Sequence, residues 1–158
     1  MNPCPCGYLG DASGRCHCTV EQVMRYRARI SGPLLDRIDM HLEVPRVPHE
    51  VLRKGSPEGE ESSAVIRARV AAARMLAVAR TGKANSAMTA KEVKQFCNLS
   101  EPGHRLLEQA MDKFGLSNRA YHRILKLART IADLAGSEAI EIVHLSEAIG
   151  YRKLDRRS

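Results

Sequence analysis

Prolines and glycines interrupt the middle of the chain and separate two parts of different pattern. They lie between residues 45 and 61, beside a run of glutamates: Pro45, Pro48, Gly55, Pro57 and Gly59. Proline lacks a backbone donor and both residue types break regular structure, so little more than a helical turn near residues 50–53 can form there. We therefore expect a linker at 45–61 between a first domain at 1–44 and a second at 62–158.

The second domain has the pattern of an all-helical bundle. Signals for helix starts and stops predict helices at about 64–80, 90–97, 101–114, 118–135 and 145–151, with N-caps at Ser62 or Ser63, Thr89, Ser100 and Ser117. Aromatic residues make up only 4% of the chain and tryptophan is absent, so the core must consist of Leu, Ile, Val and Ala. Cys97 is expected to join that core as a small buried residue.

Two of these helices carry apolar stripes at helical spacing. The first has Ile66, Val70, Ala73 and Ala77 on one face. The fourth has an apolar face made of Ala120, Ile124, Leu127, Ala128, Ile131 and Leu134. Its opposite side is basic and carries Arg119, His122, Arg123 and Lys126. Arg119 falls in the first turn, where free backbone amides favour anions, so it is a candidate phosphate ligand.

The first domain presents an arginine between a turn and an expected strand. A helix from Thr19 to about Arg29 ends at Ser31, and a turn at 32–33 then leads to two leucines, Leu34 and Leu35, that we expect to be buried. Arg37 follows. The alternation of Ile38, Met40, Leu42 and Val44 with polar residues predicts a strand over 38–44. Arg37 would therefore stand at the mouth of a strand, aimed at a partner.

Four cysteines near the start of the chain have the spacing of a metal site. Cys4, Cys6, Cys16 and Cys18 form two Cys-x-Cys pairs joined by a glycine-bearing loop. Four thiolates at one tetrahedral point suit a structural zinc, whose closed shell leaves no position for a substrate. His17 could replace one of them. Four reduced thiols without a ligand, or one or two disulfides, remain the alternatives.

The charge balance favours a phosphate-bearing partner. The chain carries a net charge of +7, with basic groups at 25–29, 119–126 and 152–157 that suit a nucleotide or a nucleic acid backbone. No apolar run approaches the roughly 20 residues that span a bilayer, and the first residues do not form a signal peptide. We expect a cytoplasmic location and no membrane partner.

Three motifs resemble one family and occur in that family's order. They are Met-Asn-Pro-Cys-Pro-Cys-Gly at 1–7, Ser-Gly-Pro-Leu-Leu-Asp-Arg-Ile-Asp at 31–39, and Ser-Asn-Arg-Ala-Tyr-His-Arg-Ile-Leu-Lys-Leu-Ala-Arg-Thr-Ile-Ala-Asp-Leu at 117–134. With them the chain resembles the C-terminal part of the Mg-chelatase-like AAA+ ATPases, nearest to the ComM/YifB group. The resemblance implies a mainly α fold: the end of an α/β core with one or two strands, then a helical lid.

The same resemblance implies roles for three residues. Asn2 matches the sensor-one asparagine, Arg37 matches the arginine finger that acts on the neighbouring subunit's nucleotide, and Arg119 matches the sensor-two arginine of the subunit's own site. ATP and Mg are the implied cofactors of the intact protein. The resemblance implies a homo-oligomeric, hexameric ring and DNA as partners. DNA branch migration during transformation is the implied role.

The nucleotide cradle itself is not in this sequence. Gly82-Lys83 lacks the rest of a P-loop, and no apolar strand ends in Asp-Glu to hold magnesium. We therefore expect a fragment or a truncated gene product that does not hydrolyse ATP alone. Two alternatives stay open: a magnesium-chelatase-type ATPase subunit, against which the cysteines argue, and a zinc-stabilised nucleic-acid-binding module without motor activity.

Overall fold

The computed structural model describes residues 1–11, 13–44, 47, 49–54 and 59–152. The chain divides into two compact units, one of Met1–Arg37 with Leu42–Glu60 and one of Ile38–His41 with the chain from Glu61 onward. Residues 45, 46, 48 and 55–58 of the predicted linker fall outside the described residues, as do Lys153, Arg156 and Arg157 of the basic tail. The predicted domain boundaries stay a prediction. No described helix is both long and apolar enough to cross a membrane.

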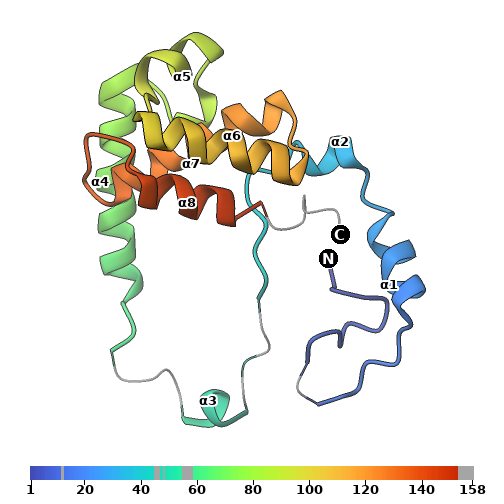
Figure 1. Cartoon of the computed structure of the whole chain (residues 1–158). Coiled ribbons are helices and arrows are strands. Elements are labelled where there is room, and N and C mark those ends of the chain that lie inside the picture. The colour runs from blue at the N-terminus through green and yellow to red at the C-terminus, as the bar shows by residue number, and fades with distance from the viewer. Residues whose placement is uncertain (12, 45–46, 48, 55–58, 153–158) are drawn as a thin grey trace. The chain divides into compact units, whose positions relative to one another are not determined.

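The first unit consists of a cysteine-rich loop and short helices (Figure 1), which are α1 (Val20–Arg27), α2 (Gly32–Leu35) and α3 (His49–Lys54). A capping box begins α1: the Gln22 amide donates to Thr19 Oγ1 at 3.3 Å, and the Thr19 amide donates to Gln22 Oε1 at 3.0 Å. These two bonds satisfy backbone donors that a helix start leaves free, so α1 begins where the sequence predicts.

The strand predicted over 38–44 is wrong for this chain. The described residues 38–44 form no strand, and a strand exists only with a hydrogen-bonding neighbour. The backbone bond found there runs from the His41 amide to the Tyr151 carbonyl at 2.7 Å. The four alternating apolar residues are exposed instead, from 38% at Ile38 and Met40 to 88% at Val44. A mainly helical fold is confirmed, whereas the predicted strand component is absent from the described part.

The leucine pair before Arg37 is less buried than the sequence suggests. Pro33 stands within the first turn of α2, and the turn expected at 32–33 is thus a short helix that ends at Asp36. Leu34 is 46% exposed and Leu35 is half-buried, so the expectation of two buried leucines is wrong. Consecutive side chains of a helix point about 100° apart, so Leu34 and Leu35 do not face the same side.

The second unit is the predicted helical bundle. It contains α4 (Ser63–Thr81), the 3-10 turn η1 (Asn85–Ala87), α5 (Ala90–Phe96), α6 (Glu101–Phe114), α7 (Asn118–Leu134) and α8 (Ile142–Gly150). Side chains of Ser62, Thr89, Ser100 and Ser117 accept hydrogen bonds from the first turns of their helices, as predicted. The last helix begins three residues earlier than predicted, because Glu141 and His144 cap it in place of a serine or threonine.

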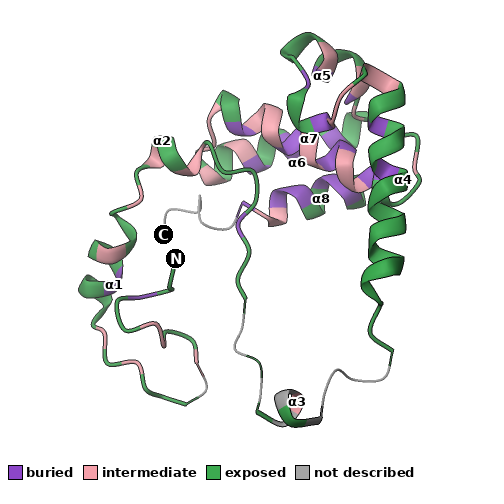
Figure 2. Cartoon of the chain, turned by 180° about the vertical axis from the view of Figure 1, so that it is seen from behind, coloured by how far each residue is buried: buried purple, intermediate pink, exposed green. Residues whose placement is uncertain are grey.

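Helix α7 is the centre of the bundle and contacts α4, α5, α8 and η1. Figure 2 shows buried residues gathered along α7 and α8. Leu107, Ile124, Ala128, Ala132 and Leu145 are at most 1% exposed and form the heart of the core, which Cys97 joins at 4%. The predicted apolar stripe of α7 is buried at Ala120, Ile124 and Ala128, and it is partly buried at Leu127 and Ile131. Leu134 at its end is 38% exposed, so the prediction is wrong for that residue.

Helix α4 is buried over only part of its length. Ala73 and Ala77 face α7, whereas Ile66 is 42% and Val70 51% exposed. The predicted inner face is therefore correct for its C-terminal half and wrong for its N-terminal half, which Figure 2 shows exposed on all sides. A periodic apolar pattern gives the direction of a helix face but not the length over which a neighbour covers it.

A buried charge network joins α4, η1 and α7. Asp133 is 4% exposed and accepts hydrogen bonds from Arg80 at 2.5 and 2.9 Å, from Asn85 at 2.7 Å and from Arg129 at 3.1 Å. Arg129, itself 2% exposed, also donates to the carbonyls of Ser137 and Glu138 at 2.5 and 2.7 Å. Both buried charges are thus paired and hydrogen-bonded, which is the condition for burying them at all.

Replacing Asp133 is the sharpest test of this network. Asp133→Ala leaves Arg129 buried without its carboxylate, and we expect it to lower the free energy of unfolding by about 3–5 kcal/mol. Urea unfolding followed by circular dichroism measures the loss. Glu108→Ala on the exposed side of α6 is the matched control and should change stability by less than about 0.5 kcal/mol.

The carboxylate of Asp133 should also make the stability of the fold depend on pH in the acid range. Burial raises the pKa of Asp133, but the hydrogen bonds from Arg80 and Asn85 and the charge of Arg129 outweigh it and hold the pKa below its ordinary value. Because the pKa of Asp133 is lower in the folded than in the unfolded chain, its ionised carboxylate stabilises the fold at pH values above the unfolded-state pKa of about 3.9. This stabilisation is lost as the pH falls through the folded-state pKa. The free energy of unfolding should therefore change less between pH 7 and pH 3 in Asp133→Asn than in wild type. An equal change in the two proteins would contradict the assignment.

Candidate functional sites

The four cysteines of the first unit converge on one point. The sulfurs of Cys4 and Cys6 are 3.3 Å apart, those of Cys4 and Cys16 3.8 Å, and those of Cys6 and Cys16 3.7 Å. With Cys18, all four sulfurs lie within 4.8 Å of one another. All are free thiols, so the disulfide alternative does not describe this structure. The predicted grouping of the four cysteines is therefore present, and His17, which is exposed, is not part of it.

Local backbone turns produce this convergence. The Gly7 amide donates to the Cys4 carbonyl at 3.0 Å and closes a tight turn between the first two cysteines. Gly7 has φ +82°, a conformation that residues with a side chain rarely adopt. Arg27 of α1 reaches back and donates to the Pro3 carbonyl at 3.3 Å, which ties the loop to the helix. Cys4 within this loop is fully buried.

The arrangement fits a tetrahedral metal ion. Zinc–sulfur bonds of about 2.3 Å in a tetrahedron place sulfurs about 3.8 Å apart, close to the observed separations. The thiols also differ in acidity. Burial raises the pKa of Cys4, but hydrogen bonds from Cys6, Leu9, Cys16 and Cys18 lower it to about 6, so one thiolate is available near neutral pH. Four soft thiolate ligands at this spacing suit zinc, whereas hard cations prefer oxygen ligands.

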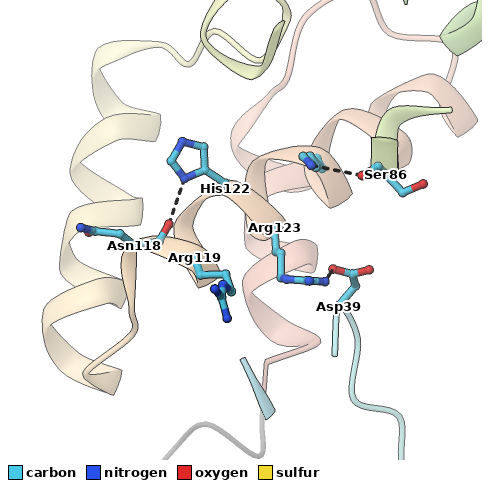
Figure 3. A pocket seen from close by; sticks show the side chains of 7 residues that line it. Asp39, Ser86, Asn118, Arg119, His122 and Arg123 are labelled. Carbon is cyan, nitrogen blue, oxygen red and sulfur yellow. Dashed lines mark hydrogen bonds and ion pairs between the residues drawn. The ribbon is translucent and has the colours of Figure 1, made fainter. Parts of the chain in front are cut away.

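A second candidate site lies at the start of α7 in the helical unit. A hollow of about 410 Å³ is lined by Asp39, Ser86, Asn118, Arg119, His122, Arg123 and Lys126. Figure 3 shows these side chains around the first turns of α7. The four basic residues line one hollow, as their helical spacing predicts, and Asp39 is the acidic residue among them.

Arg119 is the least engaged of these basic groups. It is exposed, and within the described residues its side chain forms no hydrogen bond or ion pair. It stands in the first turn of a helix whose N-cap, Ser117, accepts from the Ala120 amide at 3.2 Å. An uncommitted guanidinium beside the positive end of a long helix can bind an anionic oxygen at little cost in broken contacts.

The other basic residues of the hollow already have contacts. Arg123 forms an ion pair with Asp39. Lys126 Nζ donates to the Ser86 carbonyl at 3.1 Å, and His122 Nδ1 donates to the Asn118 carbonyl at 2.9 Å. These contacts orient the side chains that surround Arg119. The Asp39–Arg123 pair had no signal in the sequence, because the two residues are 84 positions apart.

Arg37 and Asn2 belong to the first unit. Arg37 directly follows the C-cap of α2, is exposed, and its amide donates to the Leu34 carbonyl at 3.0 Å. Asn2 is exposed, and its side-chain nitrogen lies 3.5 Å from the point where a β-carbon on Gly7 would stand. Arg119 belongs to the second unit, so each of these residues is described within its own unit and their roles stay predictions.

Comparison with known families matches nearly the whole chain. Residues 1–52 match the model for magnesium chelatase, subunit ChlI, and residues 60–152 match the model for the C-terminal region of that subunit. The competence protein ComM of Haemophilus influenzae is 44% identical over 156 residues, and the uncharacterized protein YifB of Escherichia coli is 45% identical. Both alignments cover 99% of this chain but only 30% of the relative. The chain thus spans about a third of the length of these relatives.

Proposed function

Since the chain belongs to the magnesium chelatase ChlI family, we propose that it is the C-terminal segment of an AAA+ ATPase motor similar to ComM. The observation that carries the proposal is the similarity to ComM over 99% of the chain, which includes every motif singled out in the sequence. In the intact protein, a P-loop and a magnesium site outside this chain would bind ATP and Mg. This segment would supply the lid and two arginines.

Arg119 is the proposed ligand for the phosphates of the subunit's own nucleotide. Its exposure, its place in the first turn of α7 and the basic hollow around it all favour an anion. A positive charge near the transferred phosphoryl group stabilises the negative charge that develops in the transition state. Arg119 can do this without breaking a contact within the described part of the molecule.

Arg37 is the proposed arginine finger for the nucleotide of a neighbouring subunit in a homo-oligomeric ring. It is exposed directly after a helix of one turn. A guanidinium supplied from another subunit can complete a phosphoryl-transfer site and make hydrolysis depend on assembly. Asn2 would assist as the sensor of the γ-phosphate, a role that rests on the family resemblance.

DNA is the proposed substrate of the motor. The proposal is supported by the similarity to a relative named as a competence protein and by the net charge of +7, which suits a phosphate backbone. We propose DNA branch migration during transformation as the biological role. The charge supports binding to DNA in general rather than to one sequence, since phosphate contacts carry no base information.

Arginine replacements in the complete protein test this function. We expect Arg37→Ala to lower ATP turnover by about 10³-fold or more while ATP binding is retained, because a finger acts on the transition state. Arg119→Ala should also lower turnover and weaken ATP binding, since Arg119 would touch the bound phosphates. Steady-state hydrolysis and binding of a fluorescent ATP analogue are the measurements.

Arg105→Ala is the matched control for both replacements. Arg105 is an exposed arginine of α6 outside the basic hollow, so its loss removes the same charge without touching the proposed site. Turnover in Arg105→Ala should equal that of wild type. Full turnover in Arg37→Ala would refute the finger assignment.

We also propose that the four cysteines hold one structural zinc ion. The ion would supply a crosslink between the ends of the loop at 4–18, which has few buried apolar residues of its own. Cys4, Cys6, Cys16 and Cys18 would occupy all four positions. The site would therefore stabilise the first unit rather than take part in hydrolysis.

Metal analysis tests the zinc site directly. Protein purified without chelator should contain about one zinc per chain, and Cys16→Ser should lose most of it. The control is Cys97→Ala: Cys97 is 4% exposed in the helical core, far from the loop in sequence, and its removal should leave the zinc content unchanged. Wild-type protein with four titratable thiols and no metal would refute the assignment.

A nucleic-acid-binding module without motor activity is the second candidate, which the cysteine cluster and the basic charge favour. The two functions differ in what this chain does alone. A module binds DNA by itself with an affinity that falls steeply as salt rises, whereas a motor segment requires the rest of the protein and ATP. Titration of labelled duplex DNA with this chain at salt concentrations from about 50 to about 200 mM separates the two functions, because the affinity of phosphate contacts falls steeply over this range.

A further inference from the structure

The segment Ile38–His41 is attached to the helical unit by three side-chain and backbone contacts. Asp39 pairs with Arg123 of α7, the Ile38 carbonyl accepts from Arg152, and the His41 amide donates to the Tyr151 carbonyl at 2.7 Å. The last two contacts involve Tyr151, the C-cap of α8, and Arg152, the next residue along the chain. Contacts from two helices on three of four consecutive residues explain why this segment groups with the helical unit and not with its chain neighbours.

The ion pair of this segment connects the neighbourhood of Arg37 with that of Arg119, the two arginines of the proposed function. Asp39 lies two residues after Arg37, and Arg123 lies one helical turn after Arg119 on α7. Figure 3 shows Arg123 reaching Asp39 while Arg119 stands beside it in the same hollow. A helix is stiff over one turn, so a shift of α7 at Arg119 is carried to Arg123 and to whatever Arg123 holds.

We propose that Asp39 and Arg123 are positioning residues that make the backbone at Arg37 follow α7. The inference rests on the proposed function, in which Arg119 contacts the subunit's own nucleotide and Arg37 contacts that of the neighbour. The pair then links the two sites: nucleotide at one site shifts α7, and Asp39 carries the shift to the arginine that serves the next site. In this proposal Arg119 is the phosphate ligand, and Arg123 acts through Asp39.

The exposure of the pair supports a role in coupling rather than in folding. The Asp39 side chain is 53% exposed and that of Arg123 27%. Ion pairs this accessible to water contribute little to the stability of a fold. The core of the helical unit and the two contacts from α8 do not depend on the pair. Its removal should therefore free the segment locally and leave the bundle intact, which makes the proposal testable with folded variants.

Hydrogen exchange on this chain tests the attachment. Asp39→Asn and Arg123→Gln should each raise the exchange rates of the amides at 38–41 by about two- to fivefold, the factor expected for loss of an exposed ion pair. The charge-swapped double variant Asp39→Arg with Arg123→Asp should restore slow exchange. Amides of α6 are the internal control and should not change. Unchanged rates at 38–41 in both single variants would overturn the attachment.

ATP hydrolysis by the complete protein tests the coupling. Wild type should show cooperative dependence on ATP, each single variant should keep turnover within about tenfold but lose cooperativity, and the charge swap should recover it. A merely structural role would lower turnover in the single variants without changing the cooperativity. Non-cooperative wild type, single variants with unchanged cooperativity, or a swap that fails to recover it would each overturn the inference.

The Arg37→Ala variant separates this inference from the function on which it rests. If Arg37→Ala retains full turnover, the finger assignment itself fails. If Arg37→Ala is inactive while cooperativity is unaffected in Asp39→Asn and Arg123→Gln, the finger stands and the coupling fails. Arg105→Ala again serves as the control for removal of an arginine from the helical unit.

Discussion

The buried carboxylate of Asp133 is the interaction on which the helical unit depends. It binds Arg80 of α4, Asn85 of η1 and Arg129 of its own helix, and so it joins three elements at one point. Arg129 extends the network to the two carbonyls that follow α7. Because an unpaired charge in this position would be costly, the elements can pack only in an arrangement that brings these groups together.

The packing of helix α7 fixes the position of the basic side chains that line the candidate site. The apolar side of α7 packs into the core, which fixes the rotation of the helix about its axis. The opposite side, with Arg119, Arg123 and Lys126, therefore has a defined orientation. A helix free to rotate could not hold several basic groups around one hollow. The network around Asp133 thus supports the basic hollow although none of its residues lines it.

The two candidate sites differ in how far the sequence predicts them. The cysteine site is made by residues within one short loop, and local turns suffice to bring the four sulfurs together. The basic face of α7 is likewise local, because helical periodicity alone aligns its members. By contrast, Asp39 reaches Arg123 across 84 positions, and no local pattern signals such a pair. The i,i+4 spacing of Arg129 and Asp133 was a signal for part of the buried network, but their burial was not predictable from it.

Helix positions, caps and the composition of the core follow from the sequence, because periodicity and capping act over a few residues. The behaviour of residues 38–44 does not. Their alternation is that of a strand, yet a strand needs a neighbour with free backbone groups, and the described chain provides the end of α8 and a side chain of α7 instead. Likewise the apolar stripe of α4 extends further than the surface available to cover it. Which residues are paired and which stay exposed depends on contacts between distant parts of the chain, and these exist only in the folded molecule.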